Sequence, residues 1–256
     1  MGRHTIIVDS EKCIGCGLCV RDCPQSNIDI ANQKAVIKAQ DCLMCGHCVA
    51  ICPKAAVSIT GFEEPPEEFE KQTMLSPTEL LDAIKTRRSI RRFKQQEVPG
   101  EVIGQIIEAG RFTPSAVNAQ DVSYIVLKDE REKAEKIAVK LFRRLLPLAS
   151  LFSKEARAGV GIDDHFFFKK APTAIVIVSK NRINGALAAS NMALMAEANG
   201  LGVLYSGFFT IAANVSGKLR RVLGLEHKEK VVTTLVLGYP DVNYYRTTQR
   251  ETARIR

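Results

Sequence analysis

The chain has 256 residues, of which 46% are hydrophobic and 25% charged, as in a globular protein with a sizeable core. No segment approaches the roughly 20 uninterrupted apolar residues of a membrane span, and we find no apolar stretch of signal-peptide length at the start. The net charge of +8 is uneven, because residues 74–256 hold 29 Lys and Arg against 18 Asp and Glu. Without a nucleic-acid-binding motif, we expect neither nucleic acid nor a membrane as a partner; a phosphorylated cofactor or an acidic electron-transfer partner explains the charge at least as well.

All eight cysteines lie between residues 13 and 53, in two runs of the form C-x2-C-x2-C-x3-C-P that are 29 residues apart. This spacing is typical of a bacterial-type ferredoxin with two [4Fe-4S] clusters, in which the fourth cysteine of each run ligates the other cluster. The prediction is one cluster on Cys13, Cys16, Cys19 and Cys52, and another on Cys42, Cys45, Cys48 and Cys23. Gly15, Gly17 and Gly46 suit loops whose backbone takes unusual dihedral angles close to inorganic sulfide.

Two other uses of cysteine compete with this prediction. A disulfide framework fits poorly, because the chain is long, lacks an export signal and carries its cysteines only at one end. Structural zinc is the stronger alternative, although its sites usually consist of two separated C-x2-C pairs and each run here has a third and a fourth cysteine. Reduced cysteines without an export signal predict a cytoplasmic protein, and oxygen-labile clusters favour an anaerobe.

Three regions follow one another along the chain. Residues 1–60 are predicted to form a small pseudo-symmetric two-cluster domain, with short strands at 5–8, 28–30, 35–37 and 56–59. Residues 61–73 are predicted to be an acidic linker, because they contain two adjacent prolines and five glutamates. Residues 74–256 are predicted to form a second, larger domain.

The second domain begins with a helix whose capping box has Ser76 as the cap, a proline at the first helical position and a glutamate three residues after the cap. We expect this helix to point Leu80, Leu81 and Ile84 inward. The pattern then predicts helices at 98–107, 129–146, 184–200 and 211–223, and strands at 123–127, 174–178, 202–207 and 231–237. Because helices and strands alternate, this domain is predicted to be α/β or α+β around one sheet.

Four short motifs follow one another in this domain, namely Arg87–Arg91, Pro114–Gln120, Gly200–Gly207, and Leu237–Pro240 followed by Arg250. They come in the order seen in the FMN-dependent nitroreductase family. With its cysteine runs, the chain resembles a nitroreductase family protein with an N-terminal ferredoxin domain. The resemblance implies an α+β fold class, in which a small ferredoxin-like two-cluster domain is fused to a nitroreductase-like FMN-binding α/β/α domain. It covers residues 13–53 for the clusters and 76–250 for the flavin domain.

The resemblance also implies which residues bind the flavin. Arg87, Arg88, Ser89 and Arg91 would donate to the phosphate, the alternative being a solvated helix end. Pro114, Ser115, Ala116 and Asn118 resemble the segment that the second subunit contributes to the flavin ring. Ser206 and Gly207 would offer backbone N–H groups to the ring, and Arg250, with Arg246, resembles a C-terminal phosphate ligand. For the middle two sets an ordinary turn is the alternative. His165 is predicted to be a surface or core histidine rather than a proton donor.

One departure from the family pattern leaves the ring-side packing and the substrate preference open. The family often follows Asn-x-Gln with Pro-Trp, whereas Gln120 is followed here by Asp121 and Val122, and the chain has no tryptophan.

By this resemblance the chain is expected to be an FMN and iron-sulfur dependent oxidoreductase. Two [4Fe-4S] clusters would relay single electrons to or from FMN, which would reduce a nitroaromatic, a quinone or a flavin-like acceptor. The implied partners are a second copy in a homodimer, a small organic acceptor, and a low-potential donor such as ferredoxin or NAD(P)H. No side chain is assigned as catalytic. The alternatives are an electron-transfer or redox-sensing protein with little turnover, and another flavin reaction such as reductive dehalogenation.

Overall fold

The structure is a computed structural model that describes residues 4–38, 42–69, 73–152 and 161–256. It divides into two compact units, the first made of Met1–Met74 with Ala116–Ala119 and the second of Leu75–Ser115 with Gln120–Arg256. Each unit is described here by itself. The linker predicted at 61–73 lies partly outside the described residues and stays a prediction.

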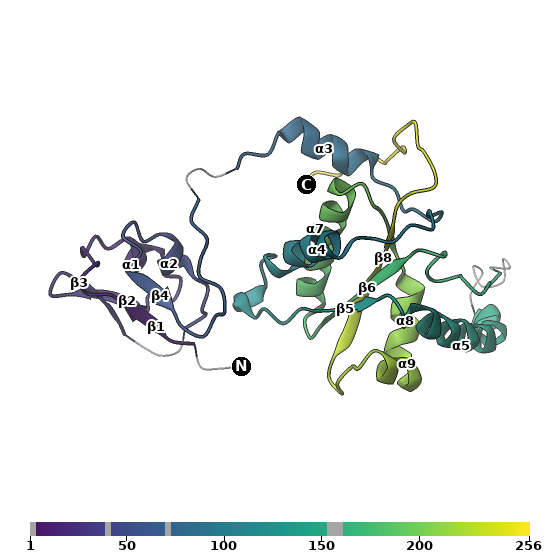
Figure 1. Cartoon of the computed structure of the whole chain (residues 1–256), viewed down its shortest axis with the longest axis horizontal. Helices are drawn as coiled ribbons and strands as arrows, with labels where there is room; N and C mark the ends of the chain where they lie inside the picture. The colour runs from purple at the N-terminus through teal and green to yellow at the C-terminus, as the bar shows by residue number, and fades with distance from the viewer. Residues whose placement is uncertain (1–3, 39–41, 70–72, 153–160) are drawn as a thin grey trace. The chain divides into compact units, whose positions relative to one another are not determined.

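The described residues between 4 and 69 form two small antiparallel sheets and two short α-helices (Figure 1). Strand β1 (Ile6–Val8) pairs with β4 (Val57–Ile59), and β2 (Ile28–Ala31) forms a hairpin with β3 (Lys34–Ile37). Asn32 and Gln33 make the hairpin turn with φ angles of 48° and 60°, as a tight two-residue turn between twisted strands requires. Helices α1 (Leu18–Asp22) and α2 (His47–Ala50) each begin inside a cysteine run. The four predicted strands are therefore confirmed to within one residue at each end.

The second unit is built around one antiparallel sheet with the strand order β5-β6-β8-β7. Its strands are β5 (Ser123–Leu127), β6 (Thr173–Ser179), β7 (Gly202–Tyr205) and β8 (Lys230–Gly238). Strand β6 lies between two partners, and all seven of its residues are buried. Its side chains point alternately to the two faces of the sheet, so both faces need a covering layer.

Helices supply those two layers (Figure 1). On one face Ile175 and Ile177 of β6 pack with helices α4 (Gly100–Arg111) and α7 (Arg182–Ala198). On the other face Val176 and Val178 pack with helices α5 (Arg131–Phe152), α8 (Gly207–Val215) and α9 (Gly217–Val222). The unit is an α/β/α sandwich with a core on each side of the sheet, which confirms the predicted α+β fold class of the chain.

Two local predictions differ from the structure. Helix α3 (Pro77–Thr86) begins at the predicted cap, with Ser76 accepting from the Glu79 N–H, but it buries none of its residues. The side chains of Leu80, Leu81 and Ile84, predicted to point inward, are 38%, 50% and 50% exposed. The single helix predicted at 211–223 is two helices, because Ser216 ends α8 in an extended conformation and caps α9. None of the helices in the described part of the chain is both long and apolar enough to cross a membrane.

Asp121 fixes the segment before β5 to the end of β6 and the start of α7. Its carboxylate accepts from the Ser179 hydroxyl at 2.8 Å, the Asn184 side chain at 2.7 Å and the backbone N–H groups of Lys180 and Asn181, both at 3.1 Å. Partial burial favours the neutral acid, but the hydrogen bonds from Asn184, Ser179 and Asn181 outweigh it and lower the pKa of Asp121.

We expect Asp121→Asn to lower the free energy of unfolding by about 2–3 kcal/mol at neutral pH, because charge-assisted acceptors are lost and an amide NH2 faces donors. The contribution of the carboxylate is fully present above its unfolded-state pKa of about 3.9 and is lost as pH falls through the lowered folded-state pKa. Urea unfolding at several pH values should therefore show the two proteins converging below about pH 4. The exposed Asp129→Asn is the control, and a gap that does not change with pH would contradict this role.

Candidate functional site

The first candidate site is a cavity in the cysteine unit. Cys13, Cys16, Cys19 and Cys52 all line it, so the structure brings together the first three cysteines of one run and the fourth of the other. Gly17 and Gly46, with φ angles of 72° and 74°, precede α1 and α2 in the two runs. Met44 takes the place of Gly15 in the second run and also has a left-handed backbone, with a φ of 53°. The two runs are thus alike in backbone as well as in spacing.

Backbone N–H groups donate to the sulfurs of four of the cysteines. The N–H···Sγ distances are 3.3–3.4 Å. The pairs are Ala35 to Cys13, Ala56 to Cys52, Met44 to Cys42, and Asn27 to Cys23. Such bonds stabilise negative charge on sulfur, and in iron-sulfur proteins they tune the reduction potential.

Burial of two cysteines in this unit disfavours their free thiolates and so suits a metal cluster. Desolvation raises the pKa of Cys48 to about 11, helped by the charge of Cys42, and burial also raises the pKa of Cys19. Thiolates held where they ionise reluctantly need a cation to neutralise them, and a coordinating metal deprotonates a thiol outright. The residues present therefore fit a bound iron-sulfur cluster.

The second candidate site is a cavity of about 530 Å³ in the α/β/α unit, where β7 ends and α8 begins. Three of the predicted flavin ligands line it, namely Arg91, Ser206 and Gly207, together with Lys169. Its walls are largely aromatic, with Phe166, Phe167, Tyr205 and Phe208 among the lining residues. An aromatic cavity of this size with cations at its edge fits a planar ring that carries negative charge.

The rest of the arginine run lies beside this cavity. Ser89 forms a bridge with Val203, and the Ile90 N–H donates to the Val203 carbonyl at 3.0 Å, which fixes the run against β7. The Arg87 guanidinium lies 5.8 Å from the centre of the Tyr205 ring. Arg88 is held by backbone carbonyls, donating to Lys85 at 3.0 Å and to Arg246 at 3.3 Å. The tail residue Arg246 therefore meets the run through its backbone.

The remaining predicted ligands do not line this cavity within one copy of the chain, and their flavin role stays a prediction. Pro114, Ser115, Ala116, Asn118 and Arg250 are not among the residues that line the 530 Å³ cavity. Asn118 belongs to the first compact unit, where its side-chain amide donates to the carbonyls of Leu43 at 3.1 Å and Met44 at 2.9 Å, in the loop between Cys42 and Cys45. The backbone N–H of Ser206, predicted to face the flavin ring, donates instead to the Thr234 carbonyl at 2.8 Å. The Ser206 hydroxyl donates to the Phe167 carbonyl at 2.9 Å.

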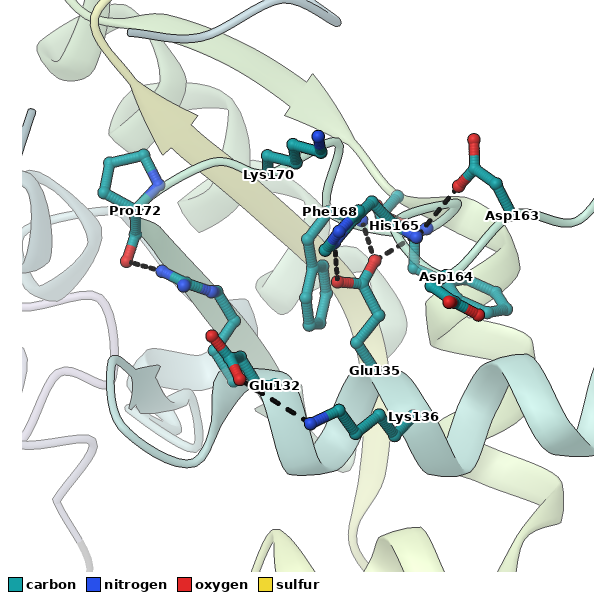
Figure 2. A network of polar contacts seen from close by, with 12 residues as sticks. Glu132, Glu135, Lys136, Asp163, Asp164, His165, Phe168, Lys170 and Pro172 are labelled. Carbon is teal, nitrogen blue, oxygen red and sulfur yellow. Dashed lines mark hydrogen bonds and ion pairs between the residues drawn. The ribbon is translucent and has the colours of Figure 1, made fainter. Parts of the chain in front are cut away.

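The sequence did not identify Glu135, which holds the aromatic wall of the cavity in place. Figure 2 shows this side chain reaching from α5 to the loop before β6, where one carboxylate oxygen accepts from the Phe167 N–H at 3.0 Å and the Phe168 N–H at 2.7 Å. His165, half-exposed, lies 3.7 Å from the other oxygen. Burial raises the pKa of Glu135, although both backbone bonds oppose this. The sequence signal that could have found Glu135 is its position between Ala134 and Ala138, two small residues that α5 buries.

Comparison with known proteins follows this geometry. Residues 84–239 match the model of the nitroreductase family, which is more than half of the chain. The chain belongs to the nitroreductase family. Residues 5–53 match the model of the 4Fe-4S dicluster domain, which confirms the predicted two-cluster ferredoxin domain.

Relatives of both parts are known. A protein of Methanothermobacter thermautotrophicus named for NADH dehydrogenase and NAD(P)H nitroreductase activity is 31% identical over 66% of this chain and 81% of its own length. Ferredoxin-2 of Desulfomicrobium norvegicum is 54% identical over 33 residues, which are 13% of this chain and 56% of that ferredoxin. A Desulfitobacterium hafniense nitroreductase solved with bound FMN has a TM-score of 0.58 at 19% identity, covering 72% of this chain and all of that one. The chain is therefore a nitroreductase-family oxidoreductase with an iron-sulfur domain.

We expect Glu135→Gln and Glu135→Ala to differ in their free energy of unfolding. In Glu135→Gln the side-chain carbonyl still accepts from both N–H groups, and the substitution removes a buried charge. The stability of this variant should therefore equal or exceed that of the wild type. Alanine leaves the buried N–H groups of Phe167 and Phe168 without this acceptor, so the free energy of unfolding should fall by about 2–4 kcal/mol. Thermal unfolding measures both, and flavin titration of the alanine variant should show weaker binding because the Phe166–Phe167 wall loosens. Equal destabilisation by the two variants would contradict the role of acceptor.

Proposed function

We propose that this nitroreductase-family chain is an FMN-dependent oxidoreductase in which two [4Fe-4S] clusters relay single electrons to or from the flavin. The observation that carries the proposal is the single cavity of about 530 Å³ lined by Arg91, Ser206 and Gly207 at the end of β7. Its volume is within the range of roughly 300–1,000 Å³ that is usual for cofactor pockets. The cysteine cavity in the same chain supplies the one-electron half of the proposal.

The chain's own residues would bind and orient the flavin. Arg91 and Lys169 would hold its negative charge, and Phe166 and Phe208 would stack or pack edge-on against a planar ring. Gly207 begins α8, so its N–H points out of a helix N-terminus, where partial positive charge favours an electron-rich atom. Bound there, FMN supplies chemistry that joins single-electron carriers to an organic acceptor that needs two electrons.

The proposed partners follow from this chemistry. The acceptor would be a small planar organic molecule, such as a nitroaromatic, a quinone or a flavin, which the aromatic wall formed by Phe166 and Phe208 would accommodate. The donor would be a low-potential carrier such as ferredoxin, or NAD(P)H, which the name of the Methanothermobacter relative mentions. The basic charge of residues 74–256 favours an acidic protein or a phosphorylated nucleotide for this part.

A homodimer is the proposed assembly. Besides the apolar face of α3, the second unit exposes Ile183 and Leu187 on α7, at 68% and 48%, and Phe208, Ile211 and Val215 on α8, at 55%, 53% and 63%. Monomeric proteins seldom expose large apolar patches, so these faces favour burial against another subunit. Phe208 and Ile211 also line the proposed flavin cavity, so a second copy covering α8 would complete its wall.

Protein purified without air should contain about eight irons and one FMN per chain, from two four-iron clusters and one flavin site. Arg91→Gln should weaken FMN binding about ten- to a hundredfold, because a charge-assisted hydrogen bond is worth about 1.5–3 kcal/mol. The neighbouring Arg92→Gln is the control, since Arg92 does not line this cavity. Fluorescence titration with FMN measures both, and a colourless, flavin-free preparation would overturn the proposal.

The reaction type is tested by mixing the dithionite-reduced protein anaerobically with a nitroaromatic, a quinone, a free flavin and a haloaromatic. Reoxidation by one of the first three, with a reduced product, is the expected outcome. Loss of halide alone would assign reductive dehalogenation, and no reoxidation by any acceptor would leave an electron-transfer or sensing protein.

Charging the apolar face of α3 should shift the dimer toward monomer. The double variant Leu81→Glu, Ile84→Glu removes two side chains whose burial is worth about 1.5–3 kcal/mol each. Asp82→Lys, on the same helix, is the control and should leave the assembly unchanged. Sedimentation velocity measures the outcome, and a wild-type protein that is monomeric at micromolar concentration would contradict the proposal.

A further inference from the structure

The two halves of the cysteine unit differ in charge although their cysteine spacing is the same. Each residue of the second half has a counterpart 29 positions earlier. On this repeat Lys34 corresponds to Thr5, and Lys54 corresponds to Gln25. In both pairs the second half has a lysine at a position where the first half has a neutral residue.

Both lysines lie beside the ligand set made of Cys13, Cys16, Cys19 and Cys52. Lys34 begins β3, and its Nζ donates to the Cys13 carbonyl at 2.6 Å, in a partly buried position. Lys54 lines the cavity formed by these four cysteines. Lys12, also next to Cys13, is paired with Asp9 at 3.6 Å and so adds little net charge.

The corresponding places in the other half carry no charge. The Gln25 side-chain oxygen accepts from the Leu43 N–H at 2.7 Å, and the Thr5 backbone N–H donates to the Thr60 hydroxyl at 3.2 Å. Arg21 and Asp22, which precede Cys23, have opposite charges. Described backbone N–H groups reach two sulfurs in each predicted ligand set, at 3.3–3.4 Å, so these bonds do not distinguish the two sets.

Reduction adds one negative charge to a cluster, so a nearby cation stabilises the reduced form and raises the potential. We propose that the cluster on Cys13, Cys16, Cys19 and Cys52 has the higher potential of the two and takes the first electron, and that the ammonium groups of Lys34 and Lys54 cause the difference. This inference rests on the two-cluster assignment in the proposed function and is independent of the flavin.

The test is a redox titration of the full-length protein, purified without air and followed by EPR of the reduced clusters. The double variant Lys34→Thr, Lys54→Gln gives the second half the neutral residues that the first half has at the corresponding positions. Lys34→Arg keeps the charge, and Lys38→Gln removes one exposed charge that does not line the cavity. Iron and sulfide are quantified in each protein, so a cluster that fails to assemble is distinguished from one whose potential has changed.

The wild type should show two separate one-electron waves. In the double variant the higher wave should move to lower potential, with a change of about tenfold in the ratio of reduced to oxidised cluster at a fixed potential, or about 59 mV. Lys34→Arg and Lys38→Gln should each change that ratio less than twofold. Any of three results would overturn the inference. They are a wild type whose two waves coincide, a double variant in which the lower wave moves, and a fully loaded double variant that titrates like the wild type.

Discussion

One backbone hydrogen bond, from the Ile90 N–H to the Val203 carbonyl, decides where the arginine run lies. It continues a parallel bridge between Ser89 and Val203 and keeps the run against the edge of the sheet. The approach is close, because a Cβ added at Gly202 would lie 2.4 Å from the Ile90 side chain. Any residue larger than glycine would separate the two segments. The position of Arg91 at the cavity therefore depends on the smallest residue of β7.

The cavity itself depends on the loop before β6, which two unrelated contacts hold. Glu135 accepts the N–H groups of Phe167 and Phe168 from the side of α5, and the Ser206 hydroxyl donates to the Phe167 carbonyl from the side of α8. Phe167 is thus fixed through both of its backbone polar groups, and its ring packs edge-on against Phe142 with centroids 5.1 Å apart. An aromatic wall held in this way is organised before any ring binds, which lowers the entropic cost of binding.

The sequence predicted features whose cause is local and missed those whose cause is distant. Cysteine spacing and strand patterning are short-range signals, so the two-cluster domain and the sheet strands were predicted closely. The amphipathic pattern of α3 predicted that Leu81 and Ile84 point inward, but a pattern does not say which element packs against them. In the structure both side chains are exposed. Glu135 interacts with residues 32 and 33 positions away, which no local pattern encodes. The amide of Asn118 likewise donates to carbonyls 75 and 74 positions away, between Cys42 and Cys45, and the flavin-ring role that the resemblance implies for Asn118 stays a prediction.

The exchange of the fourth cysteine between the two runs has a consequence for biogenesis. Cys52 lies in one cavity with Cys13, Cys16 and Cys19, so this ligand set is incomplete until the ribosome has translated both runs. A nascent chain that ends between the runs contains only three of the four cysteines of this set. On the predicted ligand sets, loading of iron would therefore follow synthesis of the whole module, and damage to either run would deprive both clusters of a ligand.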